Sequence, residues 1–147
     1  MGREELICEC ILNSYKDLER LCDICDKTIL KYAIKSHGND IYKAFDIITS
    51  LMNEKNIYCN IKVILDDAIN RLKNNTELKQ RYVFGVRIMD MQEVFGLKEN
   101  TIVKRIKRQK EKLFSCLQSK YSFEQLYDFI KNSKYLMNRY RRLCNGI

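Results

Sequence analysis

Hydrophobic residues recur every three or four positions along most of this chain, which is the spacing of an amphipathic helix. The pattern predicts one or two helices within residues 6–30, with apolar positions at Leu6, Cys10, Leu18, Leu21, Cys25 and Ile29. It predicts a further helix over Ile41–Asn53, with Asp40 as N-cap, and another from Asn56 or Asn60 to Leu72. The sequence SHGND at residues 36–40 is the clearest loop between these helices.

The second half of the chain has the same periodicity, and a few polar and glycine positions break it. The helices predicted there are Glu77–Phe84, Ile88–Phe95, Glu99–Leu117 and Phe123–Leu143. Thr76 and Ser122 are the expected N-caps of the first and last of these helices. Gly85 and Gly96 are expected to follow the ends of the first and second. Because the chain contains no proline and only five glycines, an all-α fold is predicted.

The net charge of +8 is concentrated in the second half of the chain. Residues 1–78 hold slightly more acidic than basic side chains, whereas basic side chains dominate residues 79–147. This asymmetry predicts a polyanionic partner such as double-stranded DNA. No apolar run is long enough to span a bilayer and no signal-peptide pattern follows Met1, so we expect a cytoplasmic protein with no membrane partner.

Residues 91–113 have the pattern of a helix-turn-helix, in which a supporting helix, a tight turn and a recognition helix share a small apolar brace. The side chains expected to form the brace are Met91, Val94, Phe95, Leu97, Ile102, Ile106 and Leu113. The side chains expected on the outer face of the second helix are Asn100, Val103, Lys104, Lys107 and Lys110. A strongly basic outer face of this kind favours a major-groove reader over a surface of balanced ion pairs.

The run LKQRYVFGVRIMDMQEVFGLKENTIVKRIKRQKEKL resembles region four of bacterial sigma-70-type factors, which reads the upstream promoter element. The resemblance covers about residues 62–117, with LDDAINRL (65–72) similar to the family's lead-in helix. It rests on an ungapped set of positions, namely Leu78, Arg81, Tyr82, Gly85, Glu93, Val94, Gly96, Leu97, Thr101, Ile102, Arg105, Arg108 and Leu113. The family usually has Ser or Thr at the two helix N-caps, where this chain has Arg87 and Lys98.

The resemblance implies two sets of DNA-contacting residues. The candidates for base edges in the major groove are Glu99, Asn100, Val103, Lys104 and Lys107. The candidates for backbone phosphates are Arg87, Lys98, Thr101, Arg105, Arg108 and Lys112. Arg87 and Lys98 suit phosphate because helix N-termini bind phosphate.

Residues 61–117 are therefore expected to form a sigma region 4-like helix-turn-helix domain. Residues 1–60 form a helical N-terminal segment, for which a degenerate sigma region, a dimerisation bundle and a brace for the reader helix stay open. Residues 118–147 form a basic C-terminal helix that either clamps DNA or docks on the front half or on a second subunit. The promoter-melting segment of complete sigma factors is not found, which favours a shortened, phage-type sigma-like transcription regulator that acts alone or with RNA polymerase.

Two other functions fit the same pattern. One is a protein-interaction adaptor that binds RNA polymerase or a sigma-controlling partner, and the other is a DNA adaptor in phage packaging or recombination. The adaptor would retain polymerase without DNA, whereas the packaging subunit would need a ring-sized assembly. The sequence leaves the oligomeric state open, and a dimer is compatible with it.

Cysteines and the single histidine supply the remaining candidate chemistry. Cys22 and Cys25 have the CxxC spacing of many zinc sites, and Cys8 and Cys10 could complete four sulfurs. CxC is poor spacing for such a site and no turn residue lies inside the CxxC, so we expect buried thiols that pack as small apolar groups. The same packing role is expected of Cys59, Cys116 and Cys144.

No catalytic or cofactor-binding motif accompanies these cysteines. His37 lies in the Gly-Asn loop without a Ser or Cys motif that would point to it. The carboxylate pairs Asp23/Asp26 and Asp66/Asp67 have no histidine cluster or Gly-rich phosphate loop beside them, and are expected on solvated helix faces. The sequence therefore predicts a binding protein without a metal or cofactor, and not an enzyme.

Overall fold

The computed structural model describes residues 2–35 and 41–146, and over these ranges the chain is helical without strands. The prediction of an all-α fold is confirmed. The helices are α1 (Arg3–Lys35), α2 (Ile41–Arg71), α3 (Thr76–Leu78), the π-helix η1 (Lys79–Val83), α4 (Ile88–Phe95), α5 (Glu99–Lys120), α6 (Phe123–Ile130) and α7 (Lys134–Cys144). The SHGND loop, the Asp40 cap and His37 lie outside the described residues.

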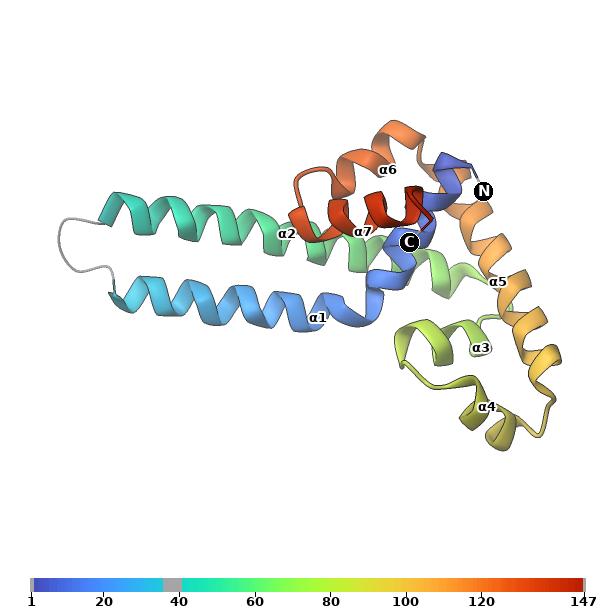
Figure 1. The fold of residues 1–147 in the computed structure, drawn as a ribbon. Coiled ribbons are helices and arrows are strands. Elements are labelled where there is room, and N and C mark those ends of the chain that lie inside the picture. The colour runs from blue at the N-terminus through green and yellow to red at the C-terminus, as the bar shows by residue number, and fades with distance from the viewer. Residues whose placement is uncertain (1, 36–40, 147) are drawn as a thin grey trace.

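Helices α1 and α2 form a long antiparallel hairpin whose far end extends away from the other helices (Figure 1). The prediction of two separate helices within 41–72 is wrong, because α2 runs without a break from Ile41 to Arg71. Asn56 and Asn60 are weak helix formers, but no glycine or proline lies near them, and the buried Tyr58 holds this stretch against the core. The expected boundary between the N-terminal segment and the domain of residues 61–117 therefore falls inside α2.

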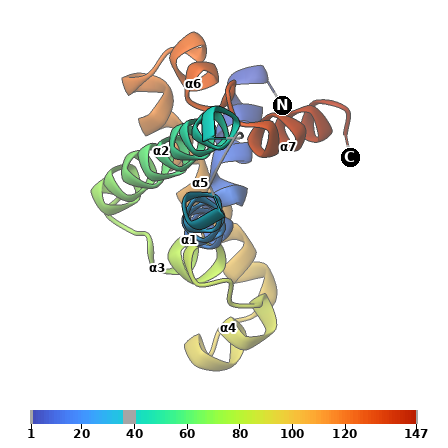
Figure 2. The same ribbon diagram turned by 90° about the vertical axis from the view of Figure 1, so that its left-hand side faces the viewer.

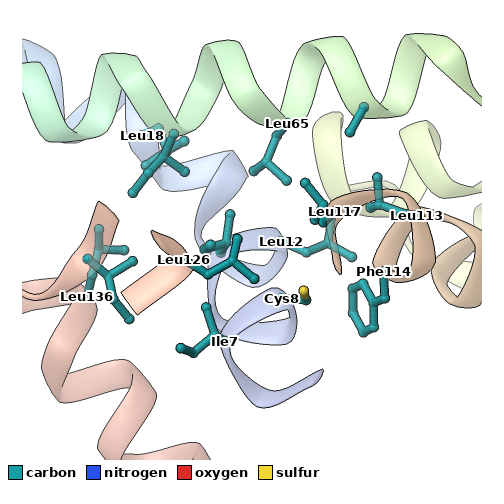
Figure 3. Close-up of a cluster of buried hydrophobic side chains, with 14 of the residues drawn as sticks. Ile7, Cys8, Leu12, Leu18, Leu65, Leu113, Phe114, Leu117, Leu126 and Leu136 are labelled. Atoms are coloured by element: carbon teal, nitrogen blue, oxygen red, sulfur yellow. The ribbon is translucent and has the colours of Figure 1, made fainter. Parts of the chain in front are cut away.

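The main hydrophobic core lies at the near end of the hairpin, where segments distant in the sequence meet (Figures 1 and 2). Side chains of α1, α2, α5, α6 and α7 contribute to it, and Figure 3 shows Leu12, Leu65, Leu117, Leu126 and Leu136 gathered there. All five are 0–1% exposed. Such burial contributes about 1.5–3 kcal/mol for each side chain, so the two ends of the chain and the middle depend on one shared core.

The segment between α2 and α4 differs from the single predicted helix Glu77–Phe84. It starts as one turn of α-helix and continues as the π-helix η1, in which the Phe84 amide donates to the Lys79 carbonyl at 3.0 Å. Asn75, not Thr76, occupies the N-cap position, and its side-chain amide donates to the Ile69 carbonyl at 2.9 Å. The N-terminus of α3 therefore lacks a cap from its own N-cap side chain.

The C-terminal segment consists of two helices, so the prediction of one helix over Phe123–Leu143 is wrong. Ser122 caps α6 in a capping box with Gln125, as the sequence indicates for Ser122. The buried Ser133 starts α7 by accepting a hydrogen bond from the Leu136 amide at 3.2 Å. A second capping side chain thus divides a stretch that has helical periodicity throughout.

Helix α7 docks on α1 in the front half of the molecule. The Tyr135 hydroxyl donates to Asp17 at 2.9 Å, and Arg139 donates to the Asn13 carbonyl at 2.7 Å. Of the two roles expected for this segment, the structure shows the docking contact. Arg141 and Arg142 remain exposed.

Most of the cysteines pack as predicted, with two exceptions. Cys8, Cys10 and Cys25 are buried, and burial raises the pKa of Cys8 and of Cys10 to about 12. Their thiols therefore stay protonated at neutral pH. Cys59 and Cys144 are exposed, so the packing role expected for them is wrong. The sulfur of Cys59 lies 3.8 Å from that of Cys22, which is partly buried on α1.

Asp66 and Asp67, predicted on a solvated helix face, take part in contacts between helices, whereas Asp23 and Asp26 are exposed as predicted. Asp66 is partly buried and accepts a hydrogen bond from Tyr15, which joins α2 to α1. Asp67 pairs with Arg71 at 3.1 Å and with Lys120 at 3.3 Å.

Within the described ranges, none of the helices combines the length and the apolarity that crossing a bilayer requires.

Candidate nucleic-acid interface

Helix α4, a left-handed glycine and helix α5 form a tight helical corner at one end of the molecule (Figure 1). The bounds of α4 are those predicted, whereas α5 extends three residues past the predicted Leu117. Gly96 has φ 63° and ψ 30°, a conformation in which a side chain would cost energy. The expected boundary between residues 117 and 118, where the C-terminal segment was to begin, falls inside α5.

A small apolar cluster, separate from the main core, braces this corner. Its buried members are Met91, Ile102 and Ile106, and Phe95 and Leu97 pack against it while partly exposed. The prediction that Val94 faces inward is wrong, because Val94 is 78% exposed. Ile88, Met91 and Phe95 supply the α4 side of the cluster, and Val94 lies about 100° around the helix from Phe95, at the edge of that face. Leu113 belongs to the main core, so α5 links the two cores.

A buried polar network fixes α5 to the start of α3. The Gln109 side chain accepts from the Leu78 amide and donates to the Glu77 carboxylate, both at 2.8 Å. Arg105 completes the network with an ion pair to Glu77 at 3.1 Å. Burial by itself raises the pKa of Glu77, but the bonds from Gln109 and its own backbone and the pairing with Arg105 outweigh burial, so this pKa lies below its ordinary value.

Lys110 is the one member of the predicted outer face of α5 that turns inward. Its ammonium lies 2.8 and 2.9 Å from the two Glu9 carboxylate oxygens, with the Tyr82 ring 5.5 Å away. Burial by itself lowers the pKa of Lys110, yet the bond and charge of Glu9 raise it above its ordinary value. Lys110 therefore anchors α5 to α1, and its expected place on the outer face is wrong.

The candidates for base contacts lie together on the first half of α5. Asn100, Val103, Lys104 and Lys107 recur at intervals of three, one and three residues, which places them on one helix face, and all four are exposed. Within the described residues, the ammonium groups of Lys104 and Lys107 lie in no ion pair. Glu99, in the first turn of α5, is also exposed.

The phosphate candidates divide into two groups. Arg105, Arg108 and Lys112 follow one side of α5 and line a groove of about 410 Å³. Asn74 and Thr76 also line this groove, although the sequence indicates only a helix break and an N-cap there. No periodic signal could have identified these two positions, because the fold alone brings the loop to α5.

The second group of phosphate candidates lies at the helix starts. Arg87 and Lys98 occupy the N-cap positions of α4 and α5, and neither side chain caps its helix. Arg87 pairs with Asp90 at 3.1 Å, whereas Lys98 is exposed. The remaining candidate, Thr101, is partly buried in the first turn of α5.

A second and larger groove, of about 690 Å³, lies along another side of α5. Val103 and Lys107 lie at its edge, and Glu5, Glu9 and Glu111 place three carboxylates along its walls. Arg81, Lys107 and Lys110 also line this groove, so its three carboxylates and three cations leave no excess positive charge for a phosphate backbone. The exposed cations of α5 therefore lie on its outer face and on the side that carries Arg108 and Lys112.

Comparison with protein-family models, with curated proteins and with solved structures finds no match to this chain.

Proposed function

We propose that this chain is a sequence-specific DNA-binding transcription regulator, in which α4 and α5 act as a helix-turn-helix. The first half of α5 would enter the major groove, while Arg108 and Lys112 on its side follow the phosphates. The observation that carries the proposal is the exposed face formed by Asn100, Val103, Lys104 and Lys107 on a helix anchored by two separate sets of contacts.

The chemistry of this face suits base edges. An asparagine side chain pairs with adenine, a lysine ammonium donates to guanine, and an exposed valine can contact the thymine methyl group. The rigid mount matters because each contact requires a fixed orientation of the helix in the groove. Together with the resemblance to sigma region four, this favours promoter DNA as the target, read by this chain alone or together with RNA polymerase.

Selection of duplexes from a random pool tests this function directly. The wild-type chain is expected to enrich one short sequence, and Lys104→Glu is expected to lose that enrichment. Loss of one base contact costs about 1–3 kcal/mol, which corresponds to roughly 5–150-fold in affinity. The new carboxylate would also lie close to phosphate groups and add repulsion.

Lys43→Glu is the matched control, because Lys43 is an exposed lysine on α2 and the substitution changes the net charge equally. It should enrich the same sequence as the wild type. Recovery of that sequence by Lys104→Glu with unchanged affinity would show that α5 does not read DNA. Equal loss in both variants would reduce the interaction to net charge.

A second candidate function, a protein adaptor, has an observation of its own. Phe84, Met89 and Val94 lie in and just before α4 and are each at least 65% exposed. Exposed apolar side chains on and near the supporting helix of a DNA-reading corner would suit a protein such as RNA polymerase. Retention of polymerase by the chain in nuclease-treated samples, lost on Val94→Glu but kept on Lys104→Glu, would favour the adaptor.

A further inference from the structure

We propose that the far half of the α1–α2 hairpin is a dimerisation surface that binds a second copy of this chain. The proposal concerns a part of the molecule remote from α5 and does not depend on DNA binding. In Figures 1 and 2 the far ends of α1 and α2 lie side by side, and none of the other drawn helices covers them.

An apolar stripe follows α2 along this hairpin. Its members are Ile41, Phe45, Ile48, Met52, Cys59 and Val63. Neighbouring members are three, four or seven residues apart, which places all of them on one face of the helix. Four of them, Ile41, Phe45, Met52 and Val63, are between 53% and 67% exposed. A stripe of this kind normally packs against another helix.

Contacts between the two helices show which side of α1 adjoins the stripe. Cys59 lies 3.8 Å from Cys22, and Lys55 pairs with Asp26 at 2.7 Å. Leu30 lies one helical turn beyond Asp26, and it is 61% exposed. Leu30 therefore extends the apolar stripe of α2 across to α1, and both helices contribute to one apolar face.

The dimensions of this face suit a protein dimer. From Ile41 to Val63, α2 rises by roughly 33 Å at 1.5 Å per residue, and two helices side by side are roughly 20 Å wide. Such a face offers roughly 660 Å², which lies within the range that each partner contributes to a standard interface. Exposed apolar side chains that gather along one face in this way mark protein interaction sites.

The charges on the face favour a second copy as the partner. Lys55 and Asp26 neutralise each other within it, although the whole chain carries a net charge of +8. The pair gives this part of the face one charge of each sign, as a contact between two identical faces requires. A two-fold axis through it would place two hairpins together as a four-helix bundle, in which both apolar stripes are buried.

The test is the mass in solution of the full chain, measured by sedimentation velocity. An interface of this size gives dissociation constants of micromolar or tighter, so the wild type at about 50 µM is expected at twice the 17.6 kDa of one chain. Phe45→Glu and Met52→Glu are each expected to weaken the dimer by at least about 30-fold. Both side chains are exposed, and an unchanged helical circular-dichroism signal would show that the monomer fold is kept.

Ile24→Glu is the matched control. Ile24 lies on the same hairpin and is 48% exposed, but it is two residues from both Cys22 and Asp26 and so points away from the face. The control should remain dimeric. A monomeric wild type at 50 µM, a dimer insensitive to Phe45→Glu and Met52→Glu, or equal loss in Ile24→Glu would overturn the proposal. A dimer that persists in Lys104→Glu, whatever happens to DNA binding, separates this inference from the proposed function.

Discussion

Replacement of Gln109 by leucine tests how firmly α5, the helix proposed to read DNA, is held against α3. Gln109 is 6% exposed on α5 and bridges to α3, where it accepts from the Leu78 amide and donates to the Glu77 carboxylate. The Leu78 amide lies in the first turn of α3, whose own N-cap side chain makes no capping bond. Gln109 thus caps α3 from another helix. Leucine has a similar volume, so the substitution mainly removes the two hydrogen bonds.

The expected cost follows from the groups that are left behind. A buried amide without an acceptor costs about 1–3 kcal/mol, and a lost hydrogen bond to a carboxylate costs about 1.5–3 kcal/mol. Arg105 still pairs with Glu77, and the leucine adds apolar burial, so the sum is offset in part. We expect Gln109→Leu to lower the free energy of unfolding by about 2–4 kcal/mol. For a chain of this size the melting temperature would fall by roughly 6–12 °C.

Urea unfolding followed by circular dichroism measures this change. Lys112→Leu is the control, because Lys112 is exposed one turn further along α5 and its replacement should change the stability by less than about 0.5 kcal/mol. If Gln109→Leu were as stable as Lys112→Leu, Gln109 would not hold α5 to α3. An altered slope of the denaturant dependence would instead indicate that the α4–α5 corner unfolds separately.

Three further predictions concern charge and capping. The pKa of Glu77 is lowered in the folded state, so its ionised form stabilises the fold above the ordinary glutamate pKa, and this stability is lost as pH falls through the folded value. Glu77→Gln should therefore unfold more readily than wild type at pH 7 and show a smaller acid-induced loss of stability, and equal pH profiles would contradict the network. Arg108→Ala should weaken binding to all duplexes similarly and reduce the slope of log affinity against log salt by about 1, as measured by fluorescence anisotropy; a change in the preferred sequence would instead place Arg108 at a base. Ser122→Ala should cost about 1 kcal/mol in urea unfolding through loss of the α6 capping box, whereas no cost would show that packing alone starts this helix.

Local patterns predicted the part of the molecule in which local rules act strongly. Gly96 follows α4 as expected, and the bounds of α4 follow from this glycine and the apolar spacing within the helix. The exposure of Lys104 and Lys107 follows from their place opposite Ile102 and Ile106 on the same helix. Helical periodicity and a single left-handed residue are properties of a short segment, so they can be read without its neighbours.

Predictions failed where a distant segment decides the environment of a residue. Lys110 looks like another exposed cation of the basic helix, but α1 brings Glu9 to it. Nothing in the sequence around Gln109 indicates burial, yet Gln109 is buried because α3 brings the Leu78 amide and the Glu77 carboxylate to it. The asparagines at 56 and 60 suggest a break, and the core around Tyr58 keeps α2 continuous across them. Tertiary packing outweighs weak local preferences of a few tenths of a kcal/mol.

The sequence by itself determined that this protein is helical, where the α4–α5 corner turns, and that its positive charge is concentrated in its second half. Only the tertiary structure decided which of those charges stay available, because α1 and α3 neutralise Lys110 and Arg105 and leave Lys104 and Lys107 exposed. The tertiary structure alone also shows that the α1–α2 hairpin carries an apolar face, which no other described helix covers. Composition and periodicity set what each segment can do, whereas neutralisation and burial require two segments to meet in space.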